Sequence, residues 1–416
     1  MKIPCRQRET CRLCHSHDLR TVLDLAATPP ANAFVSPLDD LAPQETFPLR
    51  LMFCNTCTHV QLGHVVDPSI LFENYVYVSG TSPAFRQHFS DYAASIFACY
   101  PQATDSLAVD IGSNDGVLLS AFRDLGLRIQ GVDPAVEISR NANENGIPTL
   151  NAFFSENVAS VIKEQHGLAA IVTANNVMAH IDDLSSVVTD VRTLLAIDGL
   201  FCFEVSYLLD VFEQTLFDTI YHEHLDYHTV APLVGFLARH GLTMIAAERV
   251  PSHGGSIRII AQRDDGPHPI TESVATMITA ERQAGLDDPK KIEMFAAHIE
   301  TLKQALCDVL IDKKAQGRRI FGYGAPAKAT TLMYQFGLGK EVLDCIIDDS
   351  PLKQGLASPG LHIPVVSSKI LDESPPDDVL ILAWNFADPI VAKLKPFVDQ
   401  GGHIIVPLPN LKVITK

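Results

Sequence analysis

Basic residues are scarce in this sequence: 32 Lys and Arg stand against 49 Asp and Glu, which gives a net charge of -17 over 416 residues. That charge repels phosphate backbones and anionic lipid, so it argues against nucleic acid polymers and membrane surfaces as partners. A long hydrophobic run is also missing, because no stretch approaches the ~20 apolar residues of a membrane helix. No apolar segment follows the basic N-terminal residues, as it would in a secretion signal, so we expect a cytoplasmic protein.

Internal repeats and low-complexity tracts are absent as well, and hydrophobic residues make up 47% of the chain against 19% charged residues. This composition is typical of a folded globular protein rather than a disordered one. A chain of 416 residues is long enough for two or three domains, each with a buried core.

The nine cysteines are unevenly distributed, and five of them lie within the first 57 residues. Four form two Cys-x-x-Cys pairs, Cys11 with Cys14 and Cys54 with Cys57. In a reducing compartment such pairs are metal ligands more often than disulfides, and two pairs supply the four thiolates that tetrahedral zinc prefers. We therefore predict a structural Zn²⁺ site in a zinc-ribbon lobe, with a redox dithiol as the alternative. Other side chains that could replace a ligand are Cys5, His15, His17 and His59.

A strand followed by a glycine-rich turn opens the middle of the chain. Residues 106–111 are apolar enough for a buried strand, Gly112–Gly116 follow as a turn, and 117–122 continue as a helix. This order is the first unit of a doubly wound parallel sheet, in which ligands bind beside the turn. Five of the further strands of this α/β fold, a seven-stranded Rossmann-like sheet, are expected at 128–133, 168–174, 199–205, 243–249 and 256–262.

The turn Gly112–Gly116, called here the first glycine loop, lacks the G-x-G-x-x-G pattern of a nicotinamide site. Acidic side chains at Asp110 and Asp115 would repel a pyrophosphate, whereas they suit a ligand that carries a sulfonium and an amino group. The next strand ends at Asp133, where a carboxylate can accept both ribose hydroxyls. We therefore predict S-adenosylmethionine (SAM) as the cofactor, with an ordinary turn as the alternative. The residues predicted to bind SAM are Asp110, Gly112, Asn114, Gly116, Asp133 and Asn176.

The segment 217–228, called here the histidine segment, follows the fifth strand and is dense in groups that titrate near neutral pH. Imidazole has a pKa close to the operating pH, so this segment is a candidate for acid–base catalysis. A metal site is the alternative, but the H-E-x-x-H pattern is absent because Asp226 stands four residues after His222. A second polar cluster at 175–183 follows the fourth strand, and its His180 either binds substrate or holds the loop.

A helical connector precedes the C-terminal part, with Ile292, Phe295 and Ile299 expected on one buried helical face. The chain then forms another strand and a glycine loop, Gly322–Lys328, called here the second glycine loop. It matches the G-x-G-x-x-A pattern of phosphate-binding loops, and Lys328 would add positive charge for an anion. The pattern fits either a nicotinamide site, which would make the chain a dehydrogenase, or the diphosphate of a substrate.

Together these motifs resemble the nucleotide-sugar C-methyltransferases, notably the sugar C-3 methyltransferases of deoxysugar biosynthesis. The resemblance runs along nearly the whole chain, starting at the two Cys-x-x-Cys pairs. Its further matches are Tyr75–Ser82, Asp110–Gly116, Asn176–Asp182, Tyr221–His224, His253–Arg258, Gly322–Lys328, Asp348–Gly355 and Leu382–Phe386. So many separate matches in one order argue against chance.

The resemblance implies a three-part enzyme: a zinc-binding lobe (1–72), a SAM-dependent methyltransferase domain (73–266) and a C-terminal Rossmann-like domain (317–416). The helical connector (267–316) lies between the last two parts. Substrate would lie between the lobes, and the second glycine loop would be a relic or a contact to the nucleotide sugar. The implied catalytic base is His224, with Tyr221 and Glu223 beside it. Tyr77 is the implied aromatic residue that reaches the active site from the N-terminal lobe, and His180 is a further candidate from the loop after the fourth strand.

The predicted reaction is methylation at C-3 of a 4-keto deoxysugar that is linked to a nucleotide diphosphate, dTDP or GDP. His224 would remove the proton beside the ketone, and the resulting enolate would take the methyl group from SAM. Tyr221 or His180 would stabilise the enolate oxygen, and Glu223 would anchor a sugar substituent or orient the base. We expect the enzyme to act as a monomer. The alternatives are an O- or N-methyltransferase of a small metabolite and a zinc-dependent interaction module without activity.

Overall fold

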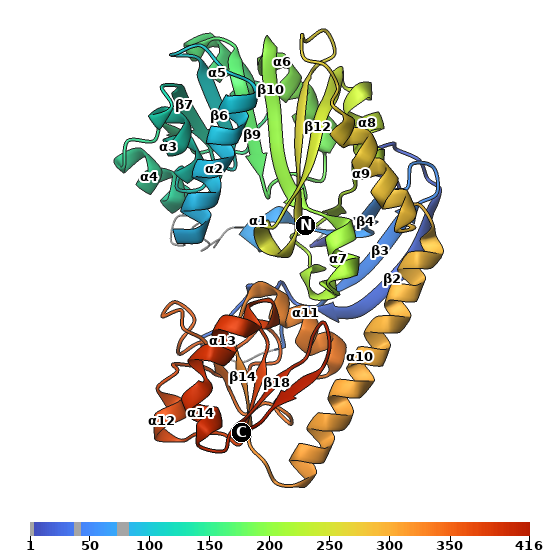
Figure 1. Ribbon diagram of the computed structural model, residues 1–416, viewed down its shortest axis with the longest axis vertical. Helices are drawn as coiled ribbons and strands as arrows, with labels where there is room; N and C mark the ends of the chain where they lie inside the picture. The colour runs from blue at the N-terminus through green and yellow to red at the C-terminus, as the bar shows by residue number, and fades with distance from the viewer. Residues whose placement is uncertain (1–3, 37–42, 73–82) are drawn as a thin grey trace.

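The computed structural model describes residues 4–36, 43–72 and 83–416. Figure 1 shows a large α/β domain at the top, a second α/β domain at the bottom, and a β-rich N-terminal lobe beside the region where they meet. No helix in these described ranges is both long enough and apolar enough to cross a lipid bilayer.

The large domain is built on a seven-stranded sheet with the order β12-β13-β10-β9-β6-β7-β8. Its strands are β6 (Leu107–Ile111), β7 (Arg128–Val132), β8 (Thr149–Leu150), β9 (Ala169–Asn175), β10 (Leu195–Ser206), β12 (Leu242–Val250) and β13 (Ser256–Arg263). Strand β13 runs antiparallel to both of its neighbours, and the other pairs are parallel. The predicted seven-stranded, Rossmann-like sheet is therefore confirmed.

Successive buried residues along the strands point to opposite faces of this sheet, and both faces are covered by helices. Ala108 and Ile171 belong to the face that α2 and α3 cover, whereas Val109 and Val172 belong to the face that α5, α6 and α8 cover. The helices of the domain are α2 (Pro83–Cys99), α3 (Val117–Asp124), α4 (Val136–Glu144), α5 (Glu156–His166), α6 (Leu184–Leu194) and α8 (Val230–Arg239). With both faces covered, the expected place for a ligand is the carboxyl edge of the parallel strands.

The N-terminal lobe contains a four-stranded sheet with the order β11-β4-β3-β2. Its elements are β2 (Leu19–Thr28), β3 (Phe47–Cys54), β4 (Val60–Leu62) and β11 (Asp226–Tyr227), with the separate pair β1 (Cys5–Gln7) and β5 (His64–Val66) and the short α1 (Pro68–Phe72). Strand β11 belongs to the histidine segment, and it pairs antiparallel with β4. The sheet of the N-terminal lobe therefore includes a strand from the large domain.

The C-terminal domain holds a six-stranded sheet with the order β16-β15-β14-β17-β18-β19. Its strands are β14 (Ile320–Tyr323), β15 (Ile346–Ile347), β16 (Val365–Val366), β17 (Asp378–Ile381), β18 (His403–Val406) and β19 (Lys412–Ile414). The helices from the connector onward are α9 (Glu272–Gln283), α10 (Pro289–Ala315), α11 (Ala327–Phe336), α12 (Ile370–Glu373), α13 (Ala387–Lys393) and α14 (Lys395–Asp399). Helix α10 runs from the large domain to the C-terminal domain, with Ile292, Phe295 and Ile299 buried as predicted (Figure 1).

The N-terminal lobe and the C-terminal domain share one apolar core. Leu23 of β2 and Leu49 of β3 belong to the same buried cluster as Leu332 of α11 and Ile346 of β15, and Phe217 joins it from the histidine segment. The sheet of the large domain is packed in separate clusters. The remaining short helices are α7 (Leu208–Glu213), η2 (Phe217–Thr219), η3 (Ser252–Gly254) and η4 (Trp384–Phe386). The histidine segment thus lies where all three parts of the chain meet.

Candidate active site and metal centre

The four cysteines of the two pairs converge in the N-terminal lobe. Their sulfur atoms all lie within 4.8 Å of one another. Sγ of Cys11 is 3.6 Å from Sγ of Cys57, and Sγ of Cys14 is 3.5 Å from Sγ of Cys54. A tetrahedral zinc ion with Zn–S bonds of ~2.3 Å holds its sulfurs roughly 3.8 Å apart, so the four thiolates fit zinc. All four positions are filled by protein, so this zinc holds structure rather than substrate.

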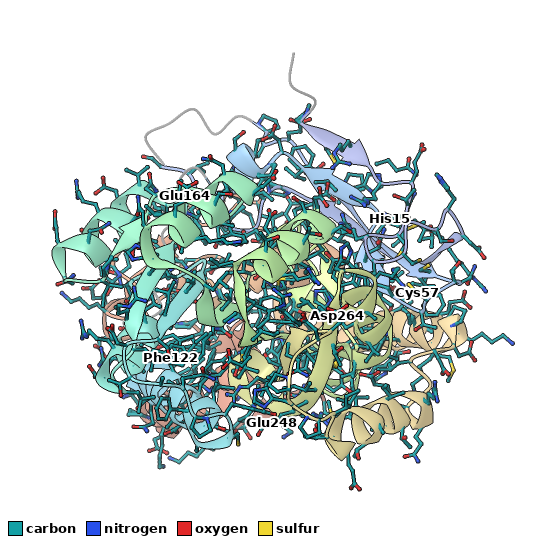
Figure 2. All side chains as sticks on the ribbon, turned by 90° about the horizontal axis from the view of Figure 1, so that it is seen from above. His15, Cys57, Phe122, Glu164, Glu248 and Asp264 are labelled. Carbon is teal, nitrogen blue, oxygen red and sulfur yellow. The ribbon has the colours of Figure 1, made fainter. Side chains whose placement is uncertain are left out.

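Both cysteine pairs form the same turn. The amide of His15 donates to the Cys11 carbonyl at 3.0 Å, and the amide of Thr58 donates to the Cys54 carbonyl at 2.8 Å. Figure 2 labels His15 and Cys57 in this lobe. Among the described residues, no other Cys, His, Asp or Glu joins the four sulfurs. The substitute ligands considered from the sequence therefore lie outside the cluster.

The first glycine loop follows β6 and requires glycine at both ends. Gly112 and Gly116 have φ angles of 68° and 77°, in the left-handed region. A Cβ atom on Gly112 would lie 2.4 Å from the side chain of Val177, and one on Gly116 would lie 2.5 Å from that of Ile147. A side chain at either position would therefore clash with a neighbouring residue, and its absence keeps the backbone open to close approach by a ligand.

Asp133, directly after β7, fixes the first glycine loop through its carboxylate. Its Oδ2 accepts a hydrogen bond from the Asn114 amide at 2.9 Å, and its Oδ1 accepts one from the Ala135 amide at 2.9 Å. Burial raises the pKa of this carboxyl, and the two amides oppose that rise. Each carboxylate oxygen has two lone pairs, so both oxygens can still accept a ribose hydroxyl.

Further polar residues lie near the first glycine loop: in β6, in the loop itself and around the end of β9. Asp110 is buried in β6, where its Oδ1 accepts a hydrogen bond from the Thr173 hydroxyl at 2.6 Å, and burial raises its pKa to about 7. Asn176, just after β9, has a left-handed φ of 56°. Ser113 Oγ and Asn175 Nδ2 are buried without a hydrogen-bond partner among the described residues. Such unsatisfied polar atoms beside an open backbone loop fit a polar ligand, as predicted for SAM.

The histidine segment and the loop after β9 bring three predicted catalytic residues together. The ring centroid of His224 lies 5.2 Å from that of His180, with the ring planes 20° apart, and 4.1 Å from that of Tyr221. Nδ1 of His224 lies 2.7 Å from the carbonyl oxygen of Thr219. Because a carbonyl oxygen only accepts, Nδ1 is assigned the proton, which leaves Nε2 as the basic atom of the neutral ring. His224 is therefore held in the tautomer that a general base needs.

The carboxyl group of Glu223 contacts the N-terminal lobe. Asn32 Nδ2 donates to Glu223 Oε1 at 3.0 Å, and the neighbouring Ala31 carbonyl accepts from the Thr330 hydroxyl of α11 at 3.0 Å. Glu223 is 5% exposed, and burial raises its pKa to about 7 against the opposing effect of Asn32. Sequence reasoning missed Asn32, because a single asparagine after a strand carries no motif.

The predicted site residues lie at two places. His180, Tyr221 and His224 form the ring cluster, and Glu223 lies in the same segment as two of them. The predicted SAM-binding residues lie at the ends of β6, β7 and β9 and in the loops that follow, at the carboxyl edge of the sheet. Tyr77 lies outside the described residues, so its predicted place in the active site stays a prediction.

The second glycine loop, between β14 and α11, uses its polar groups within the protein. The Ala325 amide donates to Asp348 Oδ2 at 2.6 Å. Lys328 is 9% exposed, and its Nζ lies 3.5 Å from Asp218 Oδ2 and 4.1 Å from the centroid of the Trp384 ring. We expected Lys328 to supply positive charge for a phosphate. In the structure its ammonium group pairs with a buried carboxylate of the histidine segment. A role of Lys328 in binding phosphate stays a prediction.

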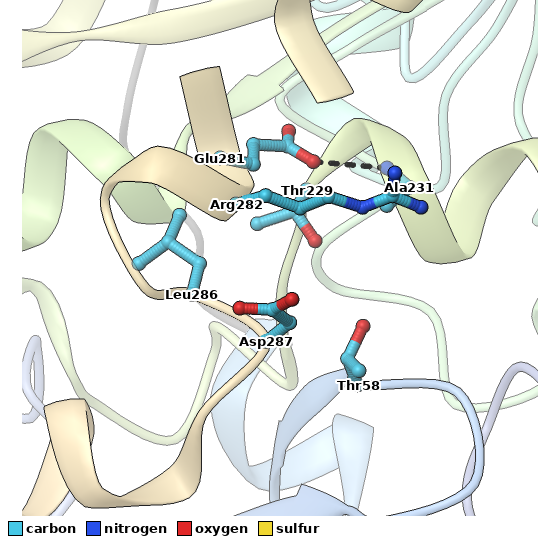
Figure 3. Close-up of a pocket in the computed structure, with 7 residues that line it drawn as sticks. All are labelled: Thr58, Thr229, Ala231, Glu281, Arg282, Leu286 and Asp287. Carbon is cyan, nitrogen blue, oxygen red and sulfur yellow. Dashed lines mark hydrogen bonds between the residues drawn. The ribbon is translucent and has the colours of Figure 1, made fainter. Parts of the chain in front are cut away.

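A cavity of about 150 Å³ lies between the N-terminal lobe, the start of α8 and the α9–α10 connection (Figure 3). Its lining residues are Thr58, Thr229, Ala231, Glu281, Arg282, Leu286 and Asp287. The Glu281 carboxylate accepts hydrogen bonds from the amides of Val230 and Ala231 at 2.6 and 3.0 Å, so it caps helix α8. The lining includes no residue of the first glycine loop or the histidine segment, and we do not assign the active site to it.

Three family profiles match consecutive parts of the chain. The one described as "Putative zinc binding domain" matches residues 11–72, "Methyltransferase domain" matches 86–247, and "C-methyltransferase C-terminal domain" matches 251–409. Together with the four thiolates and the seven-stranded sheet, these matches define a SAM-dependent methyltransferase with a structural zinc centre.

Comparison with individual proteins narrows this class. Among solved structures, the magnesium protoporphyrin IX methyltransferase ChlM of Synechocystis PCC 6803 has a TM-score of 0.33 at 13% identity, over 43% of this chain and 79% of that one. The ubiquinone biosynthesis O-methyltransferase of Colwellia psychrerythraea is 25% identical over 158 residues, 35% of this chain and 64% of that protein. The C-methyltransferase NovU of Streptomyces niveus is 35% identical over 410 residues, 99% of this chain and 98% of NovU. The chain therefore belongs to the C-methyltransferase family, and it is a SAM-dependent C-methyltransferase.

Proposed function

We propose that this enzyme methylates C-3 of a 4-keto deoxysugar carried on a nucleotide diphosphate, dTDP or GDP. The observation that carries the proposal is the tautomer of His224, whose Nδ1 lies 2.7 Å from the Thr219 carbonyl. A carbon beside a ketone becomes nucleophilic only after it loses a proton, so this reaction needs a base with an unprotonated nitrogen. The similarity to NovU, which is itself a C-methyltransferase, supports carbon as the methyl acceptor.

In this proposal His224 Nε2 takes the proton from the carbon beside the ketone. Such general base catalysis accelerates a reaction by roughly 10²–10⁴-fold. The imidazolium that forms keeps its Nδ1–H on the Thr219 carbonyl, so the ring holds its orientation through the step. When bound at the first glycine loop, SAM supplies the methyl group as an electrophile on its sulfonium.

Negative charge develops on the ketone oxygen when the proton leaves. We assign its stabilisation to the Tyr221 hydroxyl and the His180 ring, because both rings lie against His224. Glu223 has a pKa of about 7, so near neutral pH it can either donate to or accept from a sugar hydroxyl. Its bond to Asn32 fixes its orientation from the N-terminal lobe.

We infer that the sugar nucleotide lies where the zinc-binding lobe (1–72), the methyltransferase domain (73–266) and the C-terminal domain (317–416) meet, with 267–316 as the connector. Contacts at Glu223 support this location, because Asn32 reaches it and Thr330 bonds beside Asn32. One chain supplies every group named here, so the proposal needs only a monomer.

Replacement of His224 by Asn tests the proposal. Asn can still donate to the Thr219 carbonyl but has no basic nitrogen, so we expect turnover to fall by at least about 10²-fold. Turnover is measured by mass spectrometry with a panel of dTDP- and GDP-linked 4-keto deoxysugars. SAM affinity, measured by calorimetry, should stay close to the wild-type value, because the first glycine loop is unchanged.

His222→Gln is the matched control in the same segment. His222 Nε2 lies 3.1 Å from the Phe47 carbonyl, and the Gln amide can keep that hydrogen bond. Burial lowers the pKa of His222 to about 4, so it is neutral and unsuited to accept a proton in this reaction. This control should turn over near the wild-type rate. Wild-type turnover by H224N would contradict the assignment of the base.

A further inference from the structure

Arg12 stands between the two cysteines of the first zinc pair, yet its side chain reaches the large domain. It is 1% exposed. Its NH1 donates to the Leu62 carbonyl at 2.9 Å and to the Leu225 carbonyl at 3.2 Å. Its Nε donates to Asp182 Oδ1 at 3.0 Å. One buried guanidinium therefore bonds to the N-terminal lobe and to two separate loops of the large domain.

The two partners of Arg12 in the large domain are close in sequence to His180 and His224, called here the histidine pair. Leu225 directly follows His224, and Asp182 lies two residues after His180. The Leu225 amide also donates to the Ala179 carbonyl at 2.7 Å, which joins the two loops directly. The stacked rings of the pair, 5.2 Å apart, thus belong to loops that share Arg12 as a partner.

The N-terminal lobe fixes Arg12 at its backbone as well. Its amide donates to Gln61 Oε1 of β4 at 2.7 Å. On the same strand, the Leu62 amide donates to the Leu225 carbonyl at 2.8 Å, next to the β4–β11 pairing. The zinc-binding turn on either side of Arg12 limits the movement of its backbone. The backbone of Arg12 is therefore fixed at the zinc centre, while its guanidinium bonds to the loops of the large domain.

Asp182 is charged and surrounded by arginines. Its Oδ1 accepts from Arg8 NH1 at 2.9 Å, and Arg6 also donates to its carboxylate. Burial alone would raise the pKa of Asp182, but the guanidinium groups of Arg12, Arg8 and Arg6 outweigh burial and hold it below its usual value. The Arg12–Asp182 bond is thus charge-assisted, which makes it stronger and more directional than a neutral hydrogen bond.

We propose that Arg12 is a positioning residue that sets the arrangement of His180 and His224, and that the zinc centre supports catalysis through it. This inference rests on the proposed function, in which His224 is the base. Without the guanidinium, Asp182 and the Leu225 carbonyl lose their common partner, and the two loops, which keep the Leu225–Ala179 backbone bond, gain freedom to shift relative to each other. A shift of ~1 Å in a catalytic group can cost about 10²-fold in rate. Lysine is no equivalent, because an ammonium group lacks the planar fork of donors.

Replacement of Arg12 by Met removes the guanidinium and keeps an apolar side chain. The first readout needs no sugar: NMR of isotope-labelled histidine rings in the full-length, zinc-loaded enzyme. We expect the ring signals of His180 and His224 to shift or broaden in R12M. Zinc content by mass spectrometry and SAM affinity by calorimetry should stay within about two-fold of wild type. With the 4-keto sugar that the wild type accepts, kcat should fall about 10²-fold while KM for SAM is unchanged.

Arg8→Met is the matched control. Arg8 also bonds to Asp182, whereas the side-chain bond to Leu225 comes from Arg12. We expect R8M to keep the wild-type ring signals and a kcat within about two-fold of wild type. Asp182→Asn is the second test variant, and it tests the positioning role even if R12M does not fold. It weakens the charge-assisted bond in the His180 loop, so it should shift the same ring signals with a smaller loss of kcat.

Wild-type ring signals in both R12M and D182N would overturn the positioning role. Equal losses of kcat in R8M and R12M would overturn it too, because loss of charge beside Asp182 would then explain both. H224N separates this inference from the proposed function. An active H224N contradicts the base assignment, whereas an inactive H224N beside an R12M enzyme with wild-type kcat and ring signals contradicts only the role of Arg12.

Discussion

At the scale of single residues, burial brings two carboxyl groups of the site into the neutral pH range. The pKa values of Asp110 and Glu223 are both raised to about 7 by burial. Asp110 is bonded to Thr173 inside the sheet, whereas Glu223 is bonded to Asn32 of another lobe. We expect Glu223 to be the group whose protonation matters for the sugar, because it lies beside the proposed base.

Glu223→Gln tests this pKa through protein stability. The unfolded carboxyl loses its proton near pH 4.5 and the folded one near pH 7, so the folded state binds more protons in this window. The contribution of Glu223 to wild-type stability therefore falls as pH rises from 4.5 to 7, and E223Q lacks that loss. We expect E223Q to gain about 3 kcal/mol relative to wild type between pH 4.5 and 8, measured by urea unfolding. Glu164→Gln, on the surface of α5, is the control, and equal pH trends for E223Q and wild type would contradict the raised pKa.

Several site residues could be predicted from the sequence because their chemistry is local. Two Cys-x-x-Cys pairs define a zinc site by spacing alone, and the four sulfurs indeed converge. His224 stands out in a segment dense in titratable groups, although its role as base stays a proposal. Arg12 and Asn32 could not be found in this way, because their partners lie far away along the chain.

At the scale of elements, the second glycine loop shows how a motif can serve a structural purpose. Lys328 at the start of α11 pairs with Asp218 of η2, and Trp384 Nε1 donates to the same carboxylate at 2.6 Å. The Thr331 hydroxyl of α11 donates to the Ile220 carbonyl at 2.9 Å. Helix α11 therefore contacts the turn that contains Thr219, the partner of His224. The G-x-G-x-x-A pattern alone could not reveal this, since the partner carboxylate comes from another domain.

Lys328→Met tests this contact between α11 and η2. The variant leaves the Asp218 carboxylate buried without its cation, so we expect a loss of about 3 kcal/mol in the free energy of unfolding. In the double variant K328M/D218N the uncompensated charge is gone, and part of the loss should be recovered. Chemical denaturation of the full chain measures both changes.

Lys393→Met supplies the matched control for that prediction. Lys393 pairs with Asp349 at 2.7 Å, but both side chains are about half exposed. An exposed pair contributes less than about 1 kcal/mol, so K393M should be nearly as stable as wild type. If K328M were no less stable than K393M, the buried pair would not hold the two elements together.

Longer elements were predictable and short ones were not, for a physical reason. The buried faces of the seven-stranded sheet and of α10 follow from periodic apolar residues such as Ile292, Phe295 and Ile299. Strand β11 has two residues, Asp226 and Tyr227, and no pattern can appear over that length. It forms a strand because β4 pairs with it, and β4 lies in another part of the chain.

At the scale of the whole molecule, the histidine segment joins parts that fold around different cores. The N-terminal lobe and the C-terminal domain share an apolar core that includes Phe217, whereas the sheet of the large domain packs in another cluster, which also includes Cys11, Leu13 and Cys54 of the zinc turns. Arg12 of the N-terminal lobe contacts this segment at Leu225, and Lys328 of α11 contacts it at Asp218. We therefore propose that the two further parts hold the histidine segment from different directions.

The most direct test of the account locates the transferred methyl group. The wild-type enzyme is incubated with SAM labelled with ¹³C in its methyl group and with dTDP- and GDP-linked 4-keto deoxysugars, and the product is examined by two-dimensional NMR. We predict that the label is bonded to C-3, beside the ketone, and that this carbon has lost one hydrogen. A label on oxygen or nitrogen, or no transfer to any 4-keto sugar of the panel, would contradict the proposed function.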